Sequence, residues 1–169
     1  MKKLIFTVAT LLLIATQGNT QIEVGATLGV MHLPVSKTTS NLMGASVLGK
    51  YELVKTLRVG ASFGYYNQSV STNLSSFVIP MMASVDYKYS KGKFAPFGGL
   101  ELGMYRMGIS ATGFGSLATN NLAFVPMIGC DYEITKQINI TTNIKYNYVM
   151  TSGSSISGLG FNLGLAYKL

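Results

Sequence analysis

The sequence has few of the residues that stabilise or cover an ordinary soluble domain. With a single cysteine the chain cannot form an intramolecular disulfide. With only one cysteine and one histidine it also lacks the residues of the usual zinc ligand sets. Charged residues make up only 11% of the chain, whereas a typical soluble domain has about 25%. Hydrophobic residues make up 48%. The charges are therefore too few to cover a soluble surface, and nothing in the composition indicates a metal or another cofactor.

Long apolar runs are absent as well, once the first 20 residues are set aside. A membrane-spanning helix needs about 20 apolar residues, and the run at residues 4–14 is shorter. Lys2 and Lys3 precede this run and small or polar residues follow it, which is the pattern of a secretory signal peptide. We expect residues 1–20 to be a cleaved signal peptide and residues 21–169 to be the exported domain.

Acidic residues are scarce too. The chain has six Asp and Glu against 13 Lys and Arg, so its formal net charge is +7, or +5 after removal of Lys2 and Lys3. This excess is spread along the sequence and does not form a basic patch. We therefore expect no nucleic-acid partner.

An alternation of apolar and polar residues with period 2 runs through the exported region. Eight segments show it, and each predicts a β-strand. They cover about residues 22–32, 44–53, 57–66, 77–89, 94–105, 122–134, 138–149 and 158–169. Three connections are short (54–56, 90–93, 135–137), and four are long and rich in Ser, Thr, Asn and Gly (33–43, 67–76, 106–121, 150–157). In an up-and-down arrangement the long connections share one end, as in outer-membrane barrels.

One side of each predicted strand is bulky and apolar, and the other is small or polar. In the seventh segment, for example, Ile138, Ile140 and Ile144 lie on the bulky side. All six acids fall on the compact side together with several basic residues. We expect these charged side chains to form a polar core in the barrel lumen: Glu23, Lys50, Glu52, Arg58, Asp86, Lys88, Glu101, Asp131, Glu133, Lys145 and Lys168.

The width of such a barrel decides which side faces inward. An eight-stranded barrel has room inside only for side chains or one small ligand, so the bulky side must point outward, where lipid accepts it. Aromatic residues on this side gather near strand ends, as in the interface girdles of membrane barrels. The predicted girdles contain Tyr51, Phe63, Tyr65, Tyr87, Tyr89, Tyr132, Tyr146, Tyr148 and Tyr167. The sequence thus predicts an all-β, eight-stranded antiparallel transmembrane β-barrel surrounded by outer-membrane lipid.

The last predicted strand is needed to close this barrel. An open sheet edge in hydrocarbon leaves backbone groups unpaired, so we expect segment 158–169 to pair with segment 22–32. Its residues NLGLAYKL, with Asn162, Gly164, Tyr167 and Leu169, resemble the C-terminal signal that outer-membrane β-barrels present to the insertion machinery. The hairpin YSKGKFAPFGGLELG at 89–103 is similar to the small outer-membrane β-barrel-domain family of Gram-negative envelopes. The resemblance implies this fold and an outer-membrane location.

Three prolines conflict with a sheet that has no edge, because proline lacks the backbone N–H. Pro80, Pro96 and Pro126 all lie within the first five residues of their predicted strands. There, water of the headgroup region can replace the lost hydrogen bond.

Catalytic chemistry has one candidate centre. Some small outer-membrane barrels modify lipid A with His, Ser and a carboxylate, and His32 with Ser36, Ser40 or Ser154 offers two of these groups. The acids, however, lie mostly toward the other strand ends, so no complete constellation is apparent. We expect His32 to be an interfacial residue. Cys130 falls on the lipid-facing side, where it packs as a small hydrophobe.

The four long connections carry the remaining functional signal. Loops on a rigid scaffold often bind partners, and the longest, at 106–121, contains Phe114 and Leu117. It is interpreted either as a solvated loop or as an adhesive tip with a surface ligand. We expect a non-enzymatic envelope protein or a scaffold for surface loops. Three alternatives stay open: a narrow porin-like passage for small solutes, a lipid A-modifying enzyme, and a soluble exported barrel with an apolar ligand.

Overall fold

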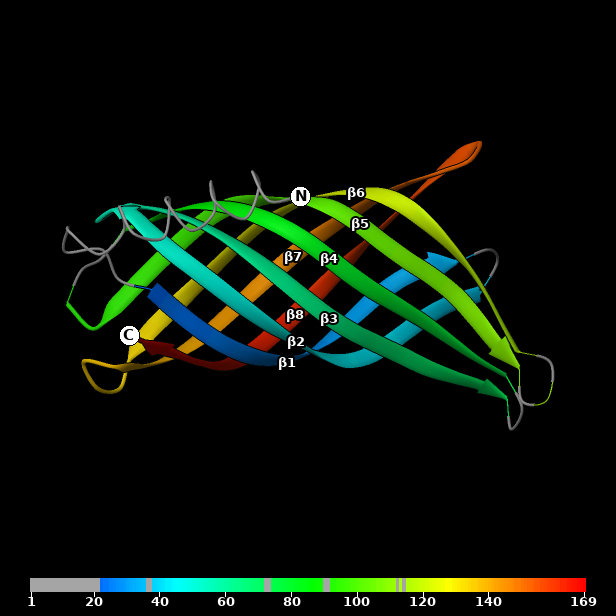
Figure 1. The fold of residues 1–169 in the computed structure, drawn as a ribbon, viewed down its shortest axis with the longest axis horizontal. Helices are drawn as coiled ribbons and strands as arrows, with labels where there is room; N and C mark the ends of the chain where they lie inside the picture. Colours follow the sequence, from blue (N-terminus) through cyan, green and yellow to red (C-terminus); the bar gives the residue numbers. More distant parts are fainter. Residues whose placement is uncertain (1–21, 36–37, 72–73, 90–91, 112, 114) are drawn as a thin grey trace, which may run out of the picture.

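Eight antiparallel strands close into one barrel, as the sequence predicted (Figure 1). The computed structural model describes residues 22–35, 38–71, 74–89, 92–111, 113 and 115–169. The expected signal peptide at 1–20 lies outside these residues. The strands are β1 (Ile22–Val35), β2 (Thr38–Val54), β3 (Leu57–Ser71), β4 (Leu74–Lys88), β5 (Phe94–Ala111), β6 (Gly115–Glu133), β7 (Ile138–Thr151) and β8 (Ser154–Lys168).

Closure is made by β1 and β8. Their antiparallel register runs from Glu23 opposite Lys168 to His32 opposite Leu159. Beyond it, the Leu169 N–H donates to the carbonyl oxygen of Ile22 at 2.8 Å. Each strand therefore has a hydrogen-bonded neighbour on both sides along the middle of the barrel.

The connections define two ends of the barrel. We call the end with residue 22, residue 169 and the connections 55–56, 89–93 and 134–137 the terminal end; it lies at the left of Figure 1. We call the opposite end, with the connections 36–37, 72–73, 112–114 and 152–153, the distal end. The three predicted short connections are confirmed at the terminal end.

The prediction of four long loops is wrong, because strand pairing continues through most of the residues assigned to them. The region 106–121, for example, forms the ends of β5 and β6, with Arg106 opposite Asn120 and Ala111 opposite Gly115. Ser, Thr and Asn are common in loops, but they also fit a solvated antiparallel ladder whose partners continue alongside. Glycines with positive φ then make the turns tight, as Gly153 does at φ 95°.

The prolines interrupt the ladder locally. Pro80 and Pro126 lie well inside β4 and β6, so their predicted position near a strand start is wrong; Pro96 does lie near the start of β5. The β3–β4 register omits the residues between Phe63 and Tyr66, opposite Pro80, and the β6–β7 register omits those between Phe124 and Met127. Each gap adjoins a proline, which cannot donate to the neighbouring strand.

Alternation sorts the side chains into an interior and an exterior. Outward positions carry large apolar side chains that are widely exposed, such as Leu28 (71%), Ile128 (66%) and Phe63 (52%). Inward positions are buried and carry nearly all the charged groups of the wall. Among the described residues, no helix is long and apolar enough to cross a membrane.

Candidate functional site

A buried arginine organises the terminal half of the barrel interior. Arg58 enters the lumen from β3, and its side chain has no exposed surface. Strand register places Glu52 and Asp86 directly across from it on the two neighbouring strands. Two positions further along β3, on the same inward face, is Gly60, where a Cβ would come within 3.0 Å of the Lys50 side chain. Because Gly60 has no side chain, the side chain of Lys50 has room to extend toward Asp86.

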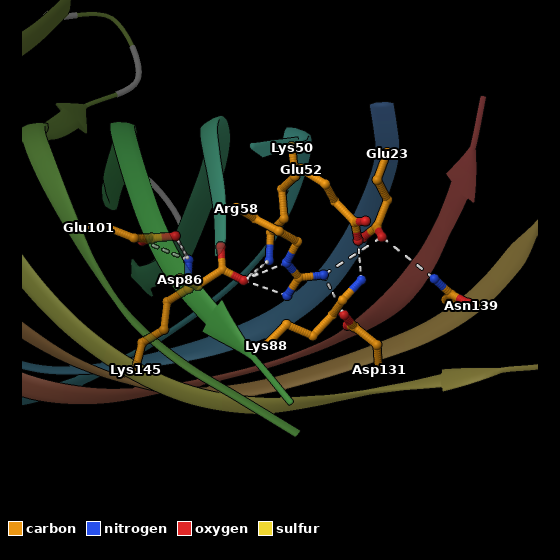
Figure 2. A network of polar contacts seen from close by, with 10 residues as sticks. All are labelled: Glu23, Lys50, Glu52, Arg58, Asp86, Lys88, Glu101, Asp131, Asn139 and Lys145. Carbon is orange, nitrogen blue, oxygen red and sulfur yellow. Dashed lines mark hydrogen bonds and ion pairs between the residues drawn. The ribbon is translucent and has the colours of Figure 1, made fainter. Parts of the chain in front are cut away.

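Three carboxylates surround the Arg58 guanidinium (Figure 2). Its Nε donates to Asp86 Oδ2 at 2.8 Å, and Nη2 donates to the same oxygen. On the other side, Nη1 donates to Asp131 Oδ2 at 2.6 Å and lies 3.7 Å from Glu23 Oε2. These acids come from β1, β4 and β6, so one side chain links four strands across the lumen.

Further groups complete this charged cluster. Lys50 Nζ donates to Asp86 Oδ2 at 3.3 Å, and Asn139 Nδ2 donates to Glu23 Oε2 at 3.5 Å. Lys50 and Arg58 also lie over the ring of Phe97, at 4.5 and 4.9 Å from its centroid. Cation–π contact of this kind lowers the cost of burying a positive charge. The sequence did not indicate the role of Phe97, because that required knowing which strands face one another.

Three other ion pairs hold the remaining charged residues of the predicted core. Lys145 Nζ donates to both oxygens of Glu101 at 2.8 Å in the middle of the barrel. Lys88 pairs with Glu52, and Lys168 Nζ lies 3.3 Å from Glu133 Oε2 at the terminal rim. All eleven predicted lumen residues thus point inward and have an opposite charge beside them.

The distal half of the interior differs from the expectation that the whole lumen is small or polar. A buried apolar cluster fills it, to which Leu33, Leu42, Val125 and Val149 each contribute side chains with at most 1% exposure. Met31, Tyr66, Val78, Met82, Tyr105 and Ala123 complete the cluster. The polar lumen is therefore confined to the terminal and middle part of the barrel.

Two tyrosines join the apolar cluster to the polar part. Tyr66 OH donates to Asn162 Oδ1 at 2.7 Å, and Tyr105 OH donates to Asn147 Oδ1 at 2.6 Å. Asn162 Nδ2 in turn donates to Asn143 Oδ1 at 2.9 Å. Each buried hydroxyl is thereby satisfied while its ring packs among apolar side chains.

Side chains leave little open space in this interior. One cavity of about 10 Å³ lies between Tyr66, Glu101, Tyr105 and Lys145, and another of about 20 Å³ lies near Asp131 and Asn139. Cavities of this size hold about one water molecule each. Neither of these two cavities has room for a solute much larger than water.

The candidate catalytic residues do not converge. His32 is exposed on the outer face of β1, where its Nδ1 lies 2.7 Å from Asn41 Oδ1. The carboxylates lie on the other side of the barrel wall. Ser154 makes its contacts with Thr151, at 3.0 Å between the hydroxyls, while Ser36 and the side chain of Ser40 are outside the described residues. His32 is thus without a catalytic partner among the side chains that the structure describes.

Cys130 and a possible metal site were two further questions that the sequence raised. Cys130 is half-buried on the outward face of β6 between Ile128 and Tyr132, and its thiol donates to the carbonyl oxygen of Asp131 at 3.4 Å. Within the described ranges, His, Cys, Asp and Glu side chains form no group of three that could hold a metal ion.

The predicted aromatic residues form two groups on the outer face. Tyr51, Tyr87, Tyr89, Tyr132 and Tyr167 lie toward the terminal end, and Phe63, Tyr65, Tyr146 and Tyr148 lie toward the distal end. Tyr51 and Tyr148 are half-buried and the others are exposed. Sequence reasoning missed Phe77, whose ring stacks on Tyr65 with 6.5 Å between centroids. It missed this contact because Phe77 stands near the expected boundary of a long loop.

At the distal end, four strands continue past their neighbours. We call residues 68–71 of β3, 74–77 of β4, 108–111 of β5 and 115–121 of β6 the distal extension; its strands pair from β3 to β6, with one register shift between Ser69 and Ser71 of β3. The β6–β7 register starts only at Leu122, so residues 115–121 pair with β5 alone among the described residues. Residues 115–120 are all exposed, with Leu117 at 86%. Phe114 of the predicted adhesive tip is outside the described residues.

Comparison with solved structures agrees with this geometry. Neisserial surface protein A matches with a TM-score of 0.69 at 15% identity, over 90% of this chain and 97% of that one. The N-terminal β-barrel domain of OprF from Pseudomonas aeruginosa matches with a TM-score of 0.66 at 14% identity, over 90% and 100%. The chain has the fold of the eight-stranded outer-membrane β-barrels.

A third similar structure is Ail, the attachment invasion locus protein of Yersinia pestis, in complex with the heparin analogue sucrose octasulfate. It matches with a TM-score of 0.59 at 17% identity, over 89% of this chain and 97% of that one. No protein-family model and no curated protein matches the sequence. At these identities the likeness concerns the fold, and the activity has to be argued from the residues of this chain.

The charged cluster gives a prediction about stability. Replacing Arg58 with Met leaves Asp86, Asp131 and Glu23 buried close together, and their remaining described partners are Lys50 for Asp86 and Asn139 for Glu23. Breaking a buried ion pair in this way typically costs about 3–5 kcal/mol. We expect the R58M barrel to lose an amount in this range from its free energy of unfolding, measured by urea titration in detergent micelles.

Arg106→Met is the matched control. Arg106 is exposed on the outer face of β5 and forms no ion pair with a described residue. We expect its replacement to leave the free energy of unfolding unchanged or higher. An R58M barrel as stable as the parent would show that the cluster does not support the fold.

Proposed function

We propose that this chain is a non-enzymatic integral protein of a Gram-negative outer membrane whose barrel presents the distal extension to binding partners at the cell surface. The observation that carries the proposal is an apolar exterior on a barrel whose interior is already filled. The exposed outward side chains have no protein partner in a single chain. A lipid environment gives them one.

Strand length and the position of the aromatic residues support the membrane placement. A tilted strand needs about 9–11 residues to cross a bilayer, whereas the strands here have 14 to 19. The surplus lies at the distal end, beyond the distal group of tyrosines and phenylalanines. The two aromatic groups then lie at the two membrane interfaces, and the distal extension stands in water.

Export and insertion follow from the same proposal. Residues 1–20 serve as a cleaved signal peptide, and the strand with Asn162, Gly164, Tyr167 and Leu169 is presented to the barrel insertion machinery. In the folded barrel Asn162 and Gly164 point inward, and Tyr167 and Leu169 point outward. This alternation is the pattern expected of a strand that is recognised before it closes a barrel.

The interior favours a structural role over transport or catalysis. Its charges are paired, its distal half is packed with apolar side chains, and the two cavities between its described side chains hold about one water each. His32 contacts Asn41 on the outer face. The barrel interior therefore acts as the rigid support, and the function lies outside it.

The free edge of β6 in the distal extension is the proposed binding surface. Residues 115–121, GSLATNN, contain no proline and no charged residue, and proteins normally use such residues to protect a sheet edge from other chains. An extended peptide can pair with an edge of this kind by adding one strand. The structure of Ail with sucrose octasulfate shows a bound ligand. For this chain, the ligand that we propose is an extended polypeptide.

Cysteine labelling in intact cells tests the membrane placement. In a Cys130→Ser background, we expect Ser116→Cys at the distal end to react with a membrane-impermeant maleimide in intact cells. Gln137→Cys at the terminal end is expected to react only after the cells are broken. Equal labelling of both in intact cells, or recovery of the protein in the soluble fraction, would contradict the proposal.

Selection of peptides tests the binding edge. Barrels in nanodiscs are panned against phage that display random ten-residue peptides, and we expect the parent to recover binders that the L117K/T119K variant recovers about tenfold less, or roughly 1.4 kcal/mol. Lysines at both positions protect the edge by charge. The control is S152K/S155K, which adds the same charges to the β7–β8 hairpin. Equal recovery by the parent and L117K/T119K would remove the edge as a binding surface.

A further inference from the structure

Each connection at the terminal end contains an exposed lysine. Lys55 lies between β2 and β3, Lys93 between β4 and β5, and Lys136 between β6 and β7. None of the three pairs with a carboxylate of a described residue, because the acids of the chain point into the barrel and pair there. We call these three residues the lysine ring. It carries three positive charges that nothing in the described structure compensates.

The lysines are spread around the rim. Two strands separate the first connection from the second and the second from the third, and four strands (β7, β8, β1 and β2) separate the third from the first, so the connections lie in three of the four quarters of the rim. The fourth quarter, between β8 and β1, has Lys168, whose ammonium is held by Glu133 at 3.3 Å. Lipid headgroups that surround the barrel at this level can contact all three lysines, each from its own side of the rim.

Apolar side chains lie next to every lysine of the ring. Val54 precedes Lys55 and is 58% exposed, Phe94 follows Lys93 and is 55% exposed, and Ile134 lies two residues before Lys136 and is 48% exposed. Lysine can lay its carbon chain along apolar surface and keep its ammonium in water. The three ammonium groups therefore lie just beyond the apolar band of the exterior.

The two ends of the barrel differ sharply in charge. The connections of the terminal end contain four lysines (Lys55, Lys91, Lys93 and Lys136), whereas those of the distal end contain one, Lys37, and the distal extension contains no Lys, Arg, Asp or Glu. An excess of one sign at one end indicates a partner of the opposite sign there.

We propose that the lysine ring binds the phosphate groups of anionic phospholipids in the leaflet at the terminal end. The inference rests on the proposed membrane placement, which puts lipid headgroups at the level of the ring. Basic residues next to a membrane attract anionic lipid by about 1 kcal/mol each, or roughly fivefold. The barrel would thereby select the lipids that surround its terminal rim.

Lipid retention in nanodiscs tests this inference. Barrels are incorporated into nanodiscs made of equal parts phosphatidylcholine and phosphatidylglycerol, then released into mild detergent, and the lipids still bound are counted by native mass spectrometry. We expect phosphatidylglycerol to exceed phosphatidylcholine by about fivefold on the parent barrel. The ratio should fall toward one in K55Q/K93Q/K136Q and remain high in K55R/K93R/K136R. Arg106→Gln, which removes a charge from the outer wall, should retain the parent ratio.

The experiment separates this inference from the function on which it rests. Failure of the parent barrel to enter nanodiscs would contradict the membrane placement itself. Normal incorporation with an equal lipid ratio on the parent, or with the same excess of phosphatidylglycerol on K55Q/K93Q/K136Q, would overturn the lysine ring as a lipid site. Displacement of the bound phosphatidylglycerol by millimolar inorganic phosphate would also overturn it, because a free phosphate site would then explain the retention.

Discussion

Backbone hydrogen bonding around a closed ring of strands is the constraint on which the rest of this structure depends. A wall without an edge needs β8 to return to β1, and the register from Glu23–Lys168 to His32–Leu159 provides that contact. Closure with eight strands fixes the width of the lumen. The narrow lumen then decides which residues face inward and leaves the bulky apolar side chains on the outside.

The interior is filled in two different ways along the barrel axis. Near the terminal end, Arg58 crosses the lumen and neutralises carboxylates from three other strands, so that charges too costly to bury singly are buried together. Toward the distal end, Leu33, Leu42, Val125 and Val149 fill the same width with apolar volume. Both halves make the barrel a solid support. The two ends are therefore free to differ, with uncharged edges at one and lysines at the other.

Much of the fold could be predicted from the sequence, because side chains alternate strictly along a strand and charges cannot face outward in an apolar wall. The inward position of Arg58, Asp86 and Glu101 followed from that rule alone. The distal extension did not, because Ser, Thr and Asn fit loops and solvated strands equally well, and only the neighbouring strands decide between them. The partners of Arg58 and the apolar cluster also required the register, which joins residues far apart in the sequence.

The central claim is that the chain forms a closed barrel with its apolar face in lipid. It is tested most directly by folding residues 21–169 into detergent and comparing boiled with unboiled samples by gel electrophoresis. We expect the unboiled protein to migrate differently from the boiled protein, because a closed barrel resists the denaturing detergent until it is heated. Identical migration, together with a folded monomer in plain buffer, would contradict the claim and would indicate a soluble barrel.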